Sequence, residues 1–454
     1  MHPLNNRKII TLLFFAILAT YGNVLLLGTF QFDDYNVIVN NPIVHSWHSW
    51  WADAGHGIRP LLKLSYTLDW TLGLGPIGFH LTNLLIHGGN TILVWLLTRH
   101  FIESYSTPNE HALLISTLTA LLFAVHPIHT EAISYISGRS SALMTLFYLG
   151  GVLAHMLGQQ KHHRFYLHGL TPLLFMAALA VKEVAITFPL ALWLLNSLMG
   201  LQWRQIIIRT WSSWVVFFAS VLFFLSDANY EAHIARSLAM NDGLSNLAVQ
   251  VNALSYLMWQ WFCPLWLNID PDLSHMSSLS LSSLILCVVA IVAFIRVLIG
   301  SSQHPWLKFA LGWVMIQHFL VYLIFPRIDI ANERQLYILS WPLLMALVAE
   351  LVRILNTRKL LLTTCLLLVS ACSMTIIRNF DYRSEVALWQ ATAKLSPNKA
   401  RVHNNLGYAY FLAGQTEQAR EHYLKAIELD ADYYKARFNL ETLNEKQVGS
   451  NLSK

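Results

Sequence analysis

Two adjacent carboxylates, Asp33 and Asp34, directly follow the first apolar segment of this sequence. Carboxylates so close together repel each other, and partial removal from water raises the pKa of at least one, which suits a general base or a cation site. A solvated helix end is the simpler alternative. Adjacent side chains diverge by about 100° in a helix and about 180° in an extended chain, so only one of the two carboxylates can face a given reacting group. We prefer Asp34 as the base, because Tyr35 and Asn36 follow it and could orient it.

Histidine and asparagine side chains recur on one face of the next apolar segment. His80, Asn83 and His87 stand at positions i, i+3 and i+7, which is the spacing of one helix face. Two histidines and an amide could ligate a metal, but no carboxylate or cysteine completes the set, so we expect no metal site here. Hydrogen bonds in helix packing are the expected role of His87.

Charged and polar residues also gather in the other connections between apolar segments. A charge near apolar helices is costly, which makes such residues functional candidates, although the Lys182–Glu183 pair could simply snorkel toward water. Arginine can hold a phosphate through two parallel hydrogen bonds. In chain order the candidates are Arg59, His126, His129, Glu131, Arg139, Lys182, Glu183, Arg327, Asp329, Glu333, Arg334 and Tyr337.

The composition indicates that membrane helices position these residues. Of the 454 residues, 55% are hydrophobic and 12% are charged, against about 25% charged in ordinary globular domains. The net charge of +5 is spread over segment ends, which argues against nucleic-acid binding. A helix of about 20 apolar residues crosses the hydrocarbon. The sequence predicts an all-α, polytopic membrane helical bundle of about eleven spans, at 9–28, 80–98, 111–127, 140–158, 166–181, 184–199, 210–226, 279–298, 306–325, 336–354 and 359–377.

The basic residues set the expected orientation of the bundle. If segment 244–267 lies flat on the outer surface instead of spanning, every basic connection falls inside, as the positive-inside rule requires. The candidate clusters and the C-terminus then lie outside. The first apolar run is not followed by a small-residue cleavage site, so we expect an uncleaved first helix. The tryptophans of the long first outer loop, 28–79, predict short helices at headgroup level.

A polar tail follows the last span, which gives a membrane domain at 1–377 and a tail domain at 378–454. The tail has the spacing of a tetratricopeptide repeat, with Leu440 following Leu406 by 34 residues. Gly407 and Ala426 would let paired helices approach closely. So few repeats cannot bury a continuous core alone, so the tail must dock on the membrane domain or on another protein. It could serve as a peptide-binding cradle or as a structural cap.

The candidate clusters all fall on one side of the predicted membrane domain. A transporter presents polar sites near the midplane to both sides in turn, whereas this arrangement suits an enzyme whose site opens outward at the lipid boundary. The arginines among the candidates could hold a phosphate group bidentately at such a site, and a carboxylate could act as a general base.

A series of motifs runs in order through nearly the whole chain. They are Phe32-Asp33-Asp34 with Asn40, Arg59-Pro60-Leu61, Gly78-Phe79-His80-Leu81-Thr82-Asn83-Leu84, the stretch 123–132, Gly138-Arg139, Lys182-Glu183, Asn332-Glu333-Arg334 with Tyr337 and Ser340, and Arg378-Asn379. At these residues the sequence resembles the transmembrane and tetratricopeptide repeat (TMTC) family. That family is a member of glycosyltransferase superfamily C (GT-C) and is related to the protein O-mannosyltransferases.

The resemblance implies a GT-C-like enzyme, a hexosyl or pentosyl transferase. Such an enzyme moves a sugar from a polyprenyl-phosphate carrier to an extracytoplasmic acceptor, here a protein hydroxyl (O-glycosylation), with Asp33 or Asp34 as the base. The long repeat array of the family is reduced here to a short helical hairpin domain, and the large middle outer loop is short. We therefore expect a bacterial relative in the inner membrane, with its active site and C-terminus on the periplasmic side.

The residues can be assigned expected roles on this basis. We expect Asp34 and Asp33 to be catalytic, and Arg59, Arg139, Lys182 and Arg334 to bind the donor phosphate. Substrate positioning falls to His80, Asn83, His126, His129, Glu131, Glu183, Glu333 and Tyr337.

The expected ligands and partners follow from the same reaction. No cofactor should be required, although the paired carboxylates could hold Mg²⁺ or Mn²⁺. The expected partners are the polyprenyl-phosphate-linked sugar, an acceptor protein docked by the repeat, and the lipid bilayer, with no nucleic acid. Two other functions fit less well: a membrane scaffold whose repeat recruits proteins for envelope assembly or secretion, and a transporter of lipid-linked glycans.

Overall fold

The computed structural model of this chain describes residues 6–105, 109–226, 243–273, 280–281, 283–285, 288, 292, 304–319, 321–322 and 330–452. Its regular elements are helices, and this described part of the chain contains no strand. The predicted all-α class is therefore confirmed. The bundle contains α1 (Asn6–Leu27), α4 (Gly75–Tyr105), α5 (Asn109–Val125), α7 (Arg139–Gln160), α8 (Thr171–Val181), α9 (Phe188–Leu198), α10 (Trp203–Ser226), α12 (Gly243–Phe262), α14 (Pro305–Val314), α16 (Ser340–Ile354) and α17 (Thr357–Asn379).

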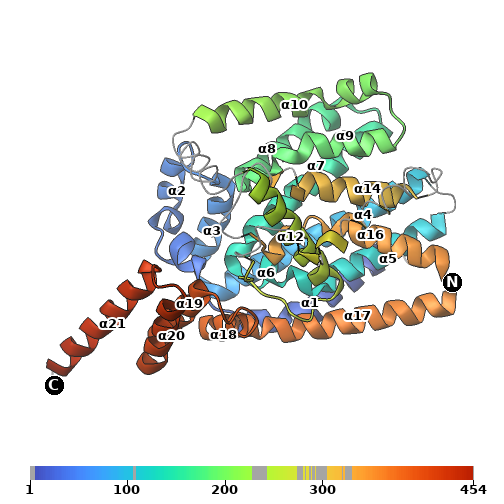
Figure 1. Ribbon diagram of the computed structural model, residues 1–454. Coiled ribbons are helices and arrows are strands. Elements are labelled where there is room, and N and C mark those ends of the chain that lie inside the picture. The colour runs from blue at the N-terminus through green and yellow to red at the C-terminus, as the bar shows by residue number, and fades with distance from the viewer. Residues whose placement is uncertain are drawn as a thin grey trace.

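The centre of the bundle is built around α4, which packs against α1, α5 and α7, while α17 packs against α1 and α5. Figure 1 shows the N-terminus at one end of these long helices and the C-terminal tail at the other. The first loop, with α2 (Trp47–Asp53) and α3 (Pro60–Leu72), lies at the same end as the tail (Figure 1). The structure thus brings the first loop and the tail together.

Five helices in the described residues are long and apolar enough to cross a membrane: Asn6–Leu27, Gly75–Tyr105, Ile136–Gln160, Trp203–Ser226 and Thr357–Arg383. A bent pair, His111–Val125 and Pro127–Ile133, would add a sixth. Two more predicted spans coincide with the shorter apolar helices Tyr166–Val181 and Glu183–Leu198. The predicted span 279–298 lies mostly outside the described residues. This is a membrane protein, and its count of about eleven spans stays a prediction.

The bend after α5 is caused by local sequence. Pro127 has no N–H and disfavours a helical conformation at the residue before it, so α5 ends at Val125. The ring Nδ1 of His126 then accepts the Ile128 N–H at 3.3 Å, which starts a short 3-10 turn, Pro127–His129. That turn leads into α6 (Thr130–Ile133), which carries Glu131.

Gly138 brings the following turn close to α6. A Cβ atom on this residue would lie 1.9 Å from the carbonyl oxygen of Glu131, so a side chain is excluded there. The close approach places the 3-10 turn Ile136–Gly138 and the start of α7 beside α6. Three candidate or neighbouring residues, Glu131, Ser137 and Arg139, are positioned by it.

The first loop is helical, as its tryptophans predict. Besides α2 and α3 it contains a π-helical turn, Tyr35–Val39, and a 3-10 turn, Pro42–His45. Arg59, the residue before α3, has a left-handed backbone with φ of 58°, and Pro60 then starts the helix with its φ already fixed. His45 stacks on Trp70 at 3.8 Å between ring centroids, which ties the early turns to α3.

The segment expected to lie flat on the outer surface forms α12, which crosses the bundle obliquely in Figure 1. Its polar side chains are buried but bonded, since Gln250 donates to Asn246 at 3.2 Å and Gln260 to Tyr256 at 2.7 Å. Trp261 donates to the Ser340 hydroxyl at 3.1 Å. The side of the membrane on which α12 lies stays a prediction.

The tail consists of α18 (Glu385–Leu395), α19 (Ala400–Leu412), α20 (Thr416–Leu429) and α21 (Tyr434–Leu452). Successive helices pack against each other, and Gly407 permits the close crossing of α19 and α20, since a Cβ there would lie 2.7 Å from the Tyr423 ring. Phe32 and Ile269 of the membrane domain pack against the tail's apolar core. The predicted docking of the tail is therefore seen, with the membrane domain as its partner.

Candidate functional site

Asp33 and Asp34 point in different directions. Asp34 is fully buried: its Oδ2 accepts the Gln31 N–H at 2.9 Å, and its Oδ1 accepts the Ser137 N–H at 2.8 Å and the Ser137 hydroxyl. Burial raises the pKa of Asp34 to about 7, because its effect is larger than that of these hydrogen bonds, which lower the pKa. Asp33 is half-buried and lines a small pocket, and its N–H donates to the Tyr135 hydroxyl at 3.0 Å. Only Asp33 of the two borders this pocket.

The pocket lies where the first loop, the segment around α6, the loop after α12, the segment before α16 and the tail converge. Its wall combines aromatic and apolar side chains with three carboxylates and two guanidinium groups. The lining residues are Phe32, Asp33, Glu131, Tyr135, Ile269, Asp270, Asn332, Arg334, Tyr382, Leu388, Trp389 and Arg401.

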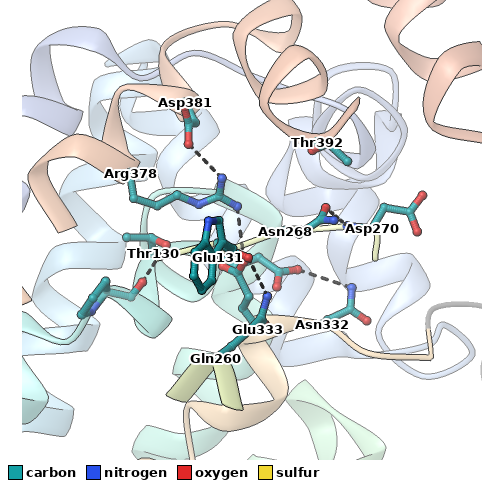
Figure 2. Close-up of polar contacts among 12 residues, drawn as sticks. Thr130, Glu131, Gln260, Asn268, Asp270, Asn332, Glu333, Arg378, Asp381 and Thr392 are labelled. Carbon is teal, nitrogen blue, oxygen red and sulfur yellow. Dashed lines mark hydrogen bonds and ion pairs between the residues drawn. The ribbon is translucent and has the colours of Figure 1, made fainter. Parts of the chain in front are cut away.

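Glu131 and Arg334 face each other in this pocket. The carboxylate lies 3.3 Å from the Arg334 Nε and accepts the Arg334 backbone N–H at 3.0 Å. Asn332 extends its amide toward the same carboxylate at 3.5 Å, as Figure 2 shows. The Glu131 side chain is buried, whereas the Arg334 side chain keeps 18% of its surface exposed. An accessible guanidinium is therefore held beside Asp33's pocket by a buried carboxylate.

Glu333 points the other way, into the protein. It accepts from Arg378 at 3.3 Å, and Arg378 also binds Asp381 at 2.8 Å (Figure 2). Burial raises the pKa of Glu333, while the Arg378 guanidinium opposes that rise. The three residues connect the segment before α16 to the end of α17, so they link the pocket wall to the start of the tail.

Arg139 is enclosed. Its Nη2 lies 2.5 Å from the Asp69 carboxylate, with both side chains at most 1% exposed. The same guanidinium donates to the Asn83 carbonyl at 2.6 Å and to the backbone carbonyls of Phe79 and Ser65 at 2.8 and 3.1 Å. Arg139 thereby joins α3, α4 and α7.

Arg59, Glu183 and Lys182 form a further polar group near Arg139. Arg59 holds Glu183 through two bonds, Nε to Oε1 at 2.9 Å and Nη2 to Oε2 at 2.8 Å. Both side chains are partly exposed, at 35% and 25%. The buried Lys182 donates to the hydroxyl of Ser141, two residues after Arg139 in α7, at 2.7 Å.

The predicted histidines and Tyr337 lie inside the bundle. Tyr337 bonds His87 at 2.7 Å and accepts from Asn90 at 3.2 Å, and its ring packs on His129 at 4.8 Å between centroids. The buried His80 lies against Gly28, where any Cβ would be 2.1 Å from its Nε2. His126 stacks on Trp261. None of these aromatic side chains is among the residues that line the pocket.

The predicted residues therefore separate into groups. Asp33, Glu131 and Arg334 share the pocket, while Asn83 and Arg139 belong to the enclosed group with Asp69. Arg327 and Asp329 lie outside the described residues. Among the residues that the structure describes, no group of three or more His, Cys, Asp or Glu side chains is arranged to hold a metal ion.

Sequence reasoning missed several residues of the site. Tyr135 could have been noticed, since it lies between the candidates Glu131 and Arg139. Asp69 stands in an ordinary helix, and Asp270 follows segment 244–267. Neither residue belongs to a sequence motif that would mark it as part of a site. In the sequence, the tail residues of the pocket stand at ordinary helix and repeat positions; they are Tyr382, Leu388, Trp389 and Arg401.

Comparisons with known proteins agree with this architecture. The tetratricopeptide repeat family matches residues 400–433. The chain is 26% identical to a protein O-mannosyl-transferase of Caenorhabditis elegans, over 89% of this chain and 60% of that protein. It is 24% identical to protein O-mannosyl-transferase TMTC3 of Homo sapiens, over 96% of this chain and 53% of that one.

A second human relative, protein O-mannosyl-transferase TMTC4, is 25% identical over 84% of this chain and 61% of its own length. The chain thus spans little more than half the length of these relatives. No solved structure matches it. The similarity extends through both the membrane domain and the repeat, and it confirms the resemblance carried by the motifs: this membrane protein is a relative of the TMTC protein O-mannosyl-transferases.

Proposed function

We propose that this protein is a membrane glycosyltransferase that moves a sugar from a polyprenyl-phosphate-linked donor to a hydroxyl group of an acceptor protein. The observation that supports it most is the pocket in which Asp33 meets the Glu131–Arg334 pair. The names of the relatives describe mannosyl transfer to proteins, so mannose is the first sugar to test. The proposed location is a bacterial inner membrane with the pocket on the periplasmic side.

In this proposal Asp33 is the general base. Its carboxylate removes the proton from the acceptor hydroxyl, whose oxygen bonds to the anomeric carbon of the sugar. The bond from that carbon to the phosphate oxygen breaks, and the phosphate leaves with the electron pair on its carrier lipid. Asp34, whose oxygens accept from Gln31 and Ser137, fixes the loop so that Asp33 faces the pocket. This reverses our preference from the sequence, because burial and bonding leave Asp34 no surface for an acceptor.

Arg334 is the proposed ligand of the donor phosphate closest to the base, since it lines the same pocket. A guanidinium placed where negative charge develops stabilises the departing phosphate. Arg59 in the first loop and Lys182 directly after α8 do not line this pocket, and they are the proposed ligands of other parts of the carrier. Arg139 would act indirectly, by holding Asn83 and Asp69 in place.

The test is sugar transfer by the purified full chain in liposomes, with polyprenyl-phosphate mannose as donor and a serine- and threonine-rich peptide as acceptor. Asp33→Asn should lower turnover by roughly 10²- to 10⁴-fold, the usual loss for a positioned base. Asp53→Asn is the matched control, because Asp53 lies in the same loop, binds Lys63 through its carboxylate at 2.6 Å, and is not one of the residues that line the pocket.

The control variant should transfer sugar at close to the wild-type rate. Wild-type turnover in Asp33→Asn would overturn the assignment of the base. Turnover lost in Asp34→Asn but kept in Asp33→Asn would restore the assignment to Asp34. No transfer by the wild-type chain from any polyprenyl-phosphate sugar tested would count against the proposed function itself.

A further inference from the structure

The tail forms part of the pocket that contains Asp33. Trp389, in the first tail helix, packs on Phe32 with ring centroids 5.1 Å apart, and Phe32 directly precedes Asp33. Gln31 donates its side-chain amide to the Tyr382 carbonyl at the start of the tail. Tyr382, Leu388, Trp389 and Arg401 all line the pocket. The repeat is therefore not a separate module reached by a linker, since its first helices close the proposed active site.

A buried carboxylate of the membrane domain forms ion pairs with two residues of the tail. Asp270, in the loop after α12, binds Lys399 at 2.6 Å and the Nε of Arg401 at 2.7 Å. Ser396 reinforces the contact by donating to the Asp270 carbonyl at 3.0 Å and accepting from Asn268 at 2.8 Å. Asp270 itself is only 4% exposed, which fixes the position of both cations. Asp270 and Glu131 line the same pocket, and Figure 2 shows both side chains.

The two cations on Asp270 differ in what else they touch. Arg401 lines the pocket, whereas Lys399 is not one of its lining residues and instead also donates to the Pro271 carbonyl at 2.8 Å. The Nε contact with Asp270 orients the Arg401 guanidinium plane at the pocket wall. Arginine carries donors in a planar fork and no acceptor, so it binds carbonyl, carboxylate and phosphate oxygens.

We propose that Arg401 binds the acceptor polypeptide, by donating to backbone carbonyl oxygens next to the hydroxyl that Asp33 deprotonates. This inference rests on the proposed function and adds to it a residue that selects the acceptor. The donor is held in the membrane by its lipid, so its phosphate reaches residues of the bundle such as Arg334. An acceptor comes from the aqueous side, where the tail extends away from the bundle (Figure 1). The apolar surfaces of Leu388 and Ile269 in the same wall suit the side chains of a peptide.

Binding can be measured apart from catalysis. The probe is a fluorescein-labelled, uncharged serine- and threonine-rich peptide, and its anisotropy is followed with the full chain in nanodiscs, without donor. Arg401→Ala should weaken peptide binding by roughly ten- to a hundredfold, the range for losing a charged hydrogen-bond donor. Lys399→Ala should leave peptide affinity close to the wild-type value, because Lys399 is not one of the residues that line the pocket. Both variants lose one contact with Asp270, so any loss of docking should appear in the melting temperature of both.

A second variant separates binding from docking. Arg401→Lys keeps a cation for Asp270 but lacks the planar fork, so peptide affinity should still fall several-fold while the melting temperature stays at the wild-type value. Equal peptide affinities in Arg401→Ala, Lys399→Ala and the wild type would overturn the inference. A loss of affinity for polyprenyl-phosphate mannose, with peptide affinity unchanged, would also overturn it, in favour of a phosphate ligand. Peptide binding that depends on Arg401 in a chain that transfers no sugar would uphold the binding site and refute only the proposed reaction.

Discussion

Two arginine–carboxylate pairs lie at opposite ends of the segment 131–139, and their surroundings differ. Arg139 and Asp69 are enclosed, with at most 1% of either side chain exposed, and the guanidinium is surrounded by protein acceptors. Arg334 and Glu131 border a pocket, and the arginine is 18% exposed. In the sequence both arginines are charges in connections between apolar helices. The difference shows that such a charge can be enclosed by the fold or can border a pocket, even when its partner is a buried carboxylate in both cases.

The largest expected effect is on the enclosed pair. Arg139→Ala leaves the Asp69 carboxylate buried without its ion-pair partner, which should cost about 3–5 kcal/mol of stability. Arg334→Ala should lower the melting temperature of the purified chain in detergent less, because the buried Glu131 keeps the backbone N–H of residue 334 and the Asn332 amide as hydrogen-bond partners. Equal melting temperatures for the two variants would show that the enclosed pair is no more structural than the open one.

A double variant checks the cause of that loss. Replacing Arg139 by Met and Asp69 by Leu together removes both buried charges and fills the site with apolar groups. Such replacements are often neutral or stabilising. The double variant should therefore melt above Arg139→Ala, and a lower melting temperature would indicate that the hydrogen bonds to Asn83 and Phe79 dominate instead.

The next effect concerns Asp34, which is bonded to Ser137 between the two pairs. Its pKa rises from an ordinary value of 3.8 to about 7 because of burial. The folded chain then binds a proton that the unfolded chain has lost, so this part of the stability is complete below pH of about 4 and disappears as the pH rises through about 7. Asp34→Asn cannot ionise and should lose less stability over that interval.

Melting curves of wild type and Asp34→Asn between these pH values test the prediction. Glu385 also has a pKa raised by burial to about 7, so the comparison must be the difference between the two proteins. Parallel curves would mean that Asp34 is ionised throughout the interval, held by its bonds to Ser137 and Gln31.

Much of this architecture follows from the sequence because its signals are local. Apolar runs predict α1, α4, α7, α10 and α17, and repeat spacing predicts the paired helices of the tail. The divergence of Asp33 and Asp34 follows from their adjacency. These features depend on hydrophobic periodicity and on neighbouring residues, which a sequence displays directly.

The partners of the charged residues could not be predicted, because they depend on contacts between distant segments. Arg139 meets Asp69 through the crossing of α3 and α7, and Arg401 meets Asp270 only when the tail docks. Asp33 and Asp34 illustrate the same limit. Their order along the chain says that they diverge, but the position of Ser137 decides which one is enclosed.

A smaller effect is expected at the open pair. Arg334→Ala should lower sugar transfer by roughly ten- to a hundredfold, because a charged hydrogen bond to the phosphate is lost. Arg334→Lys should recover only part of the rate, since an ammonium group keeps the charge but not the planar fork. Full activity of both variants in the liposome assay would assign Arg334 to packing against Glu131.

The smallest effect is expected at Arg59, whose pair with Glu183 is intermediate between the two others, with the side chains 35% and 25% exposed. A pair in such surroundings contributes about 0.2–1 kcal/mol. The backbone of Arg59 is left-handed, with φ of 58°, which costs a non-glycine residue roughly 1–2 kcal/mol. Arg59→Ala loses the pair and keeps the backbone strain, whereas Arg59→Gly loses the pair and relieves it, at the expense of a more flexible unfolded chain. The glycine variant should therefore be more stable than the alanine variant by about 1 kcal/mol.

Both variants of Arg59 should have equally lowered affinity for the lipid-linked donor if the guanidinium binds the carrier. An alanine variant that melts as high as the glycine variant would show that this backbone is unstrained, and unchanged donor affinity in both would make Arg59, like Arg139, a residue that only holds the fold.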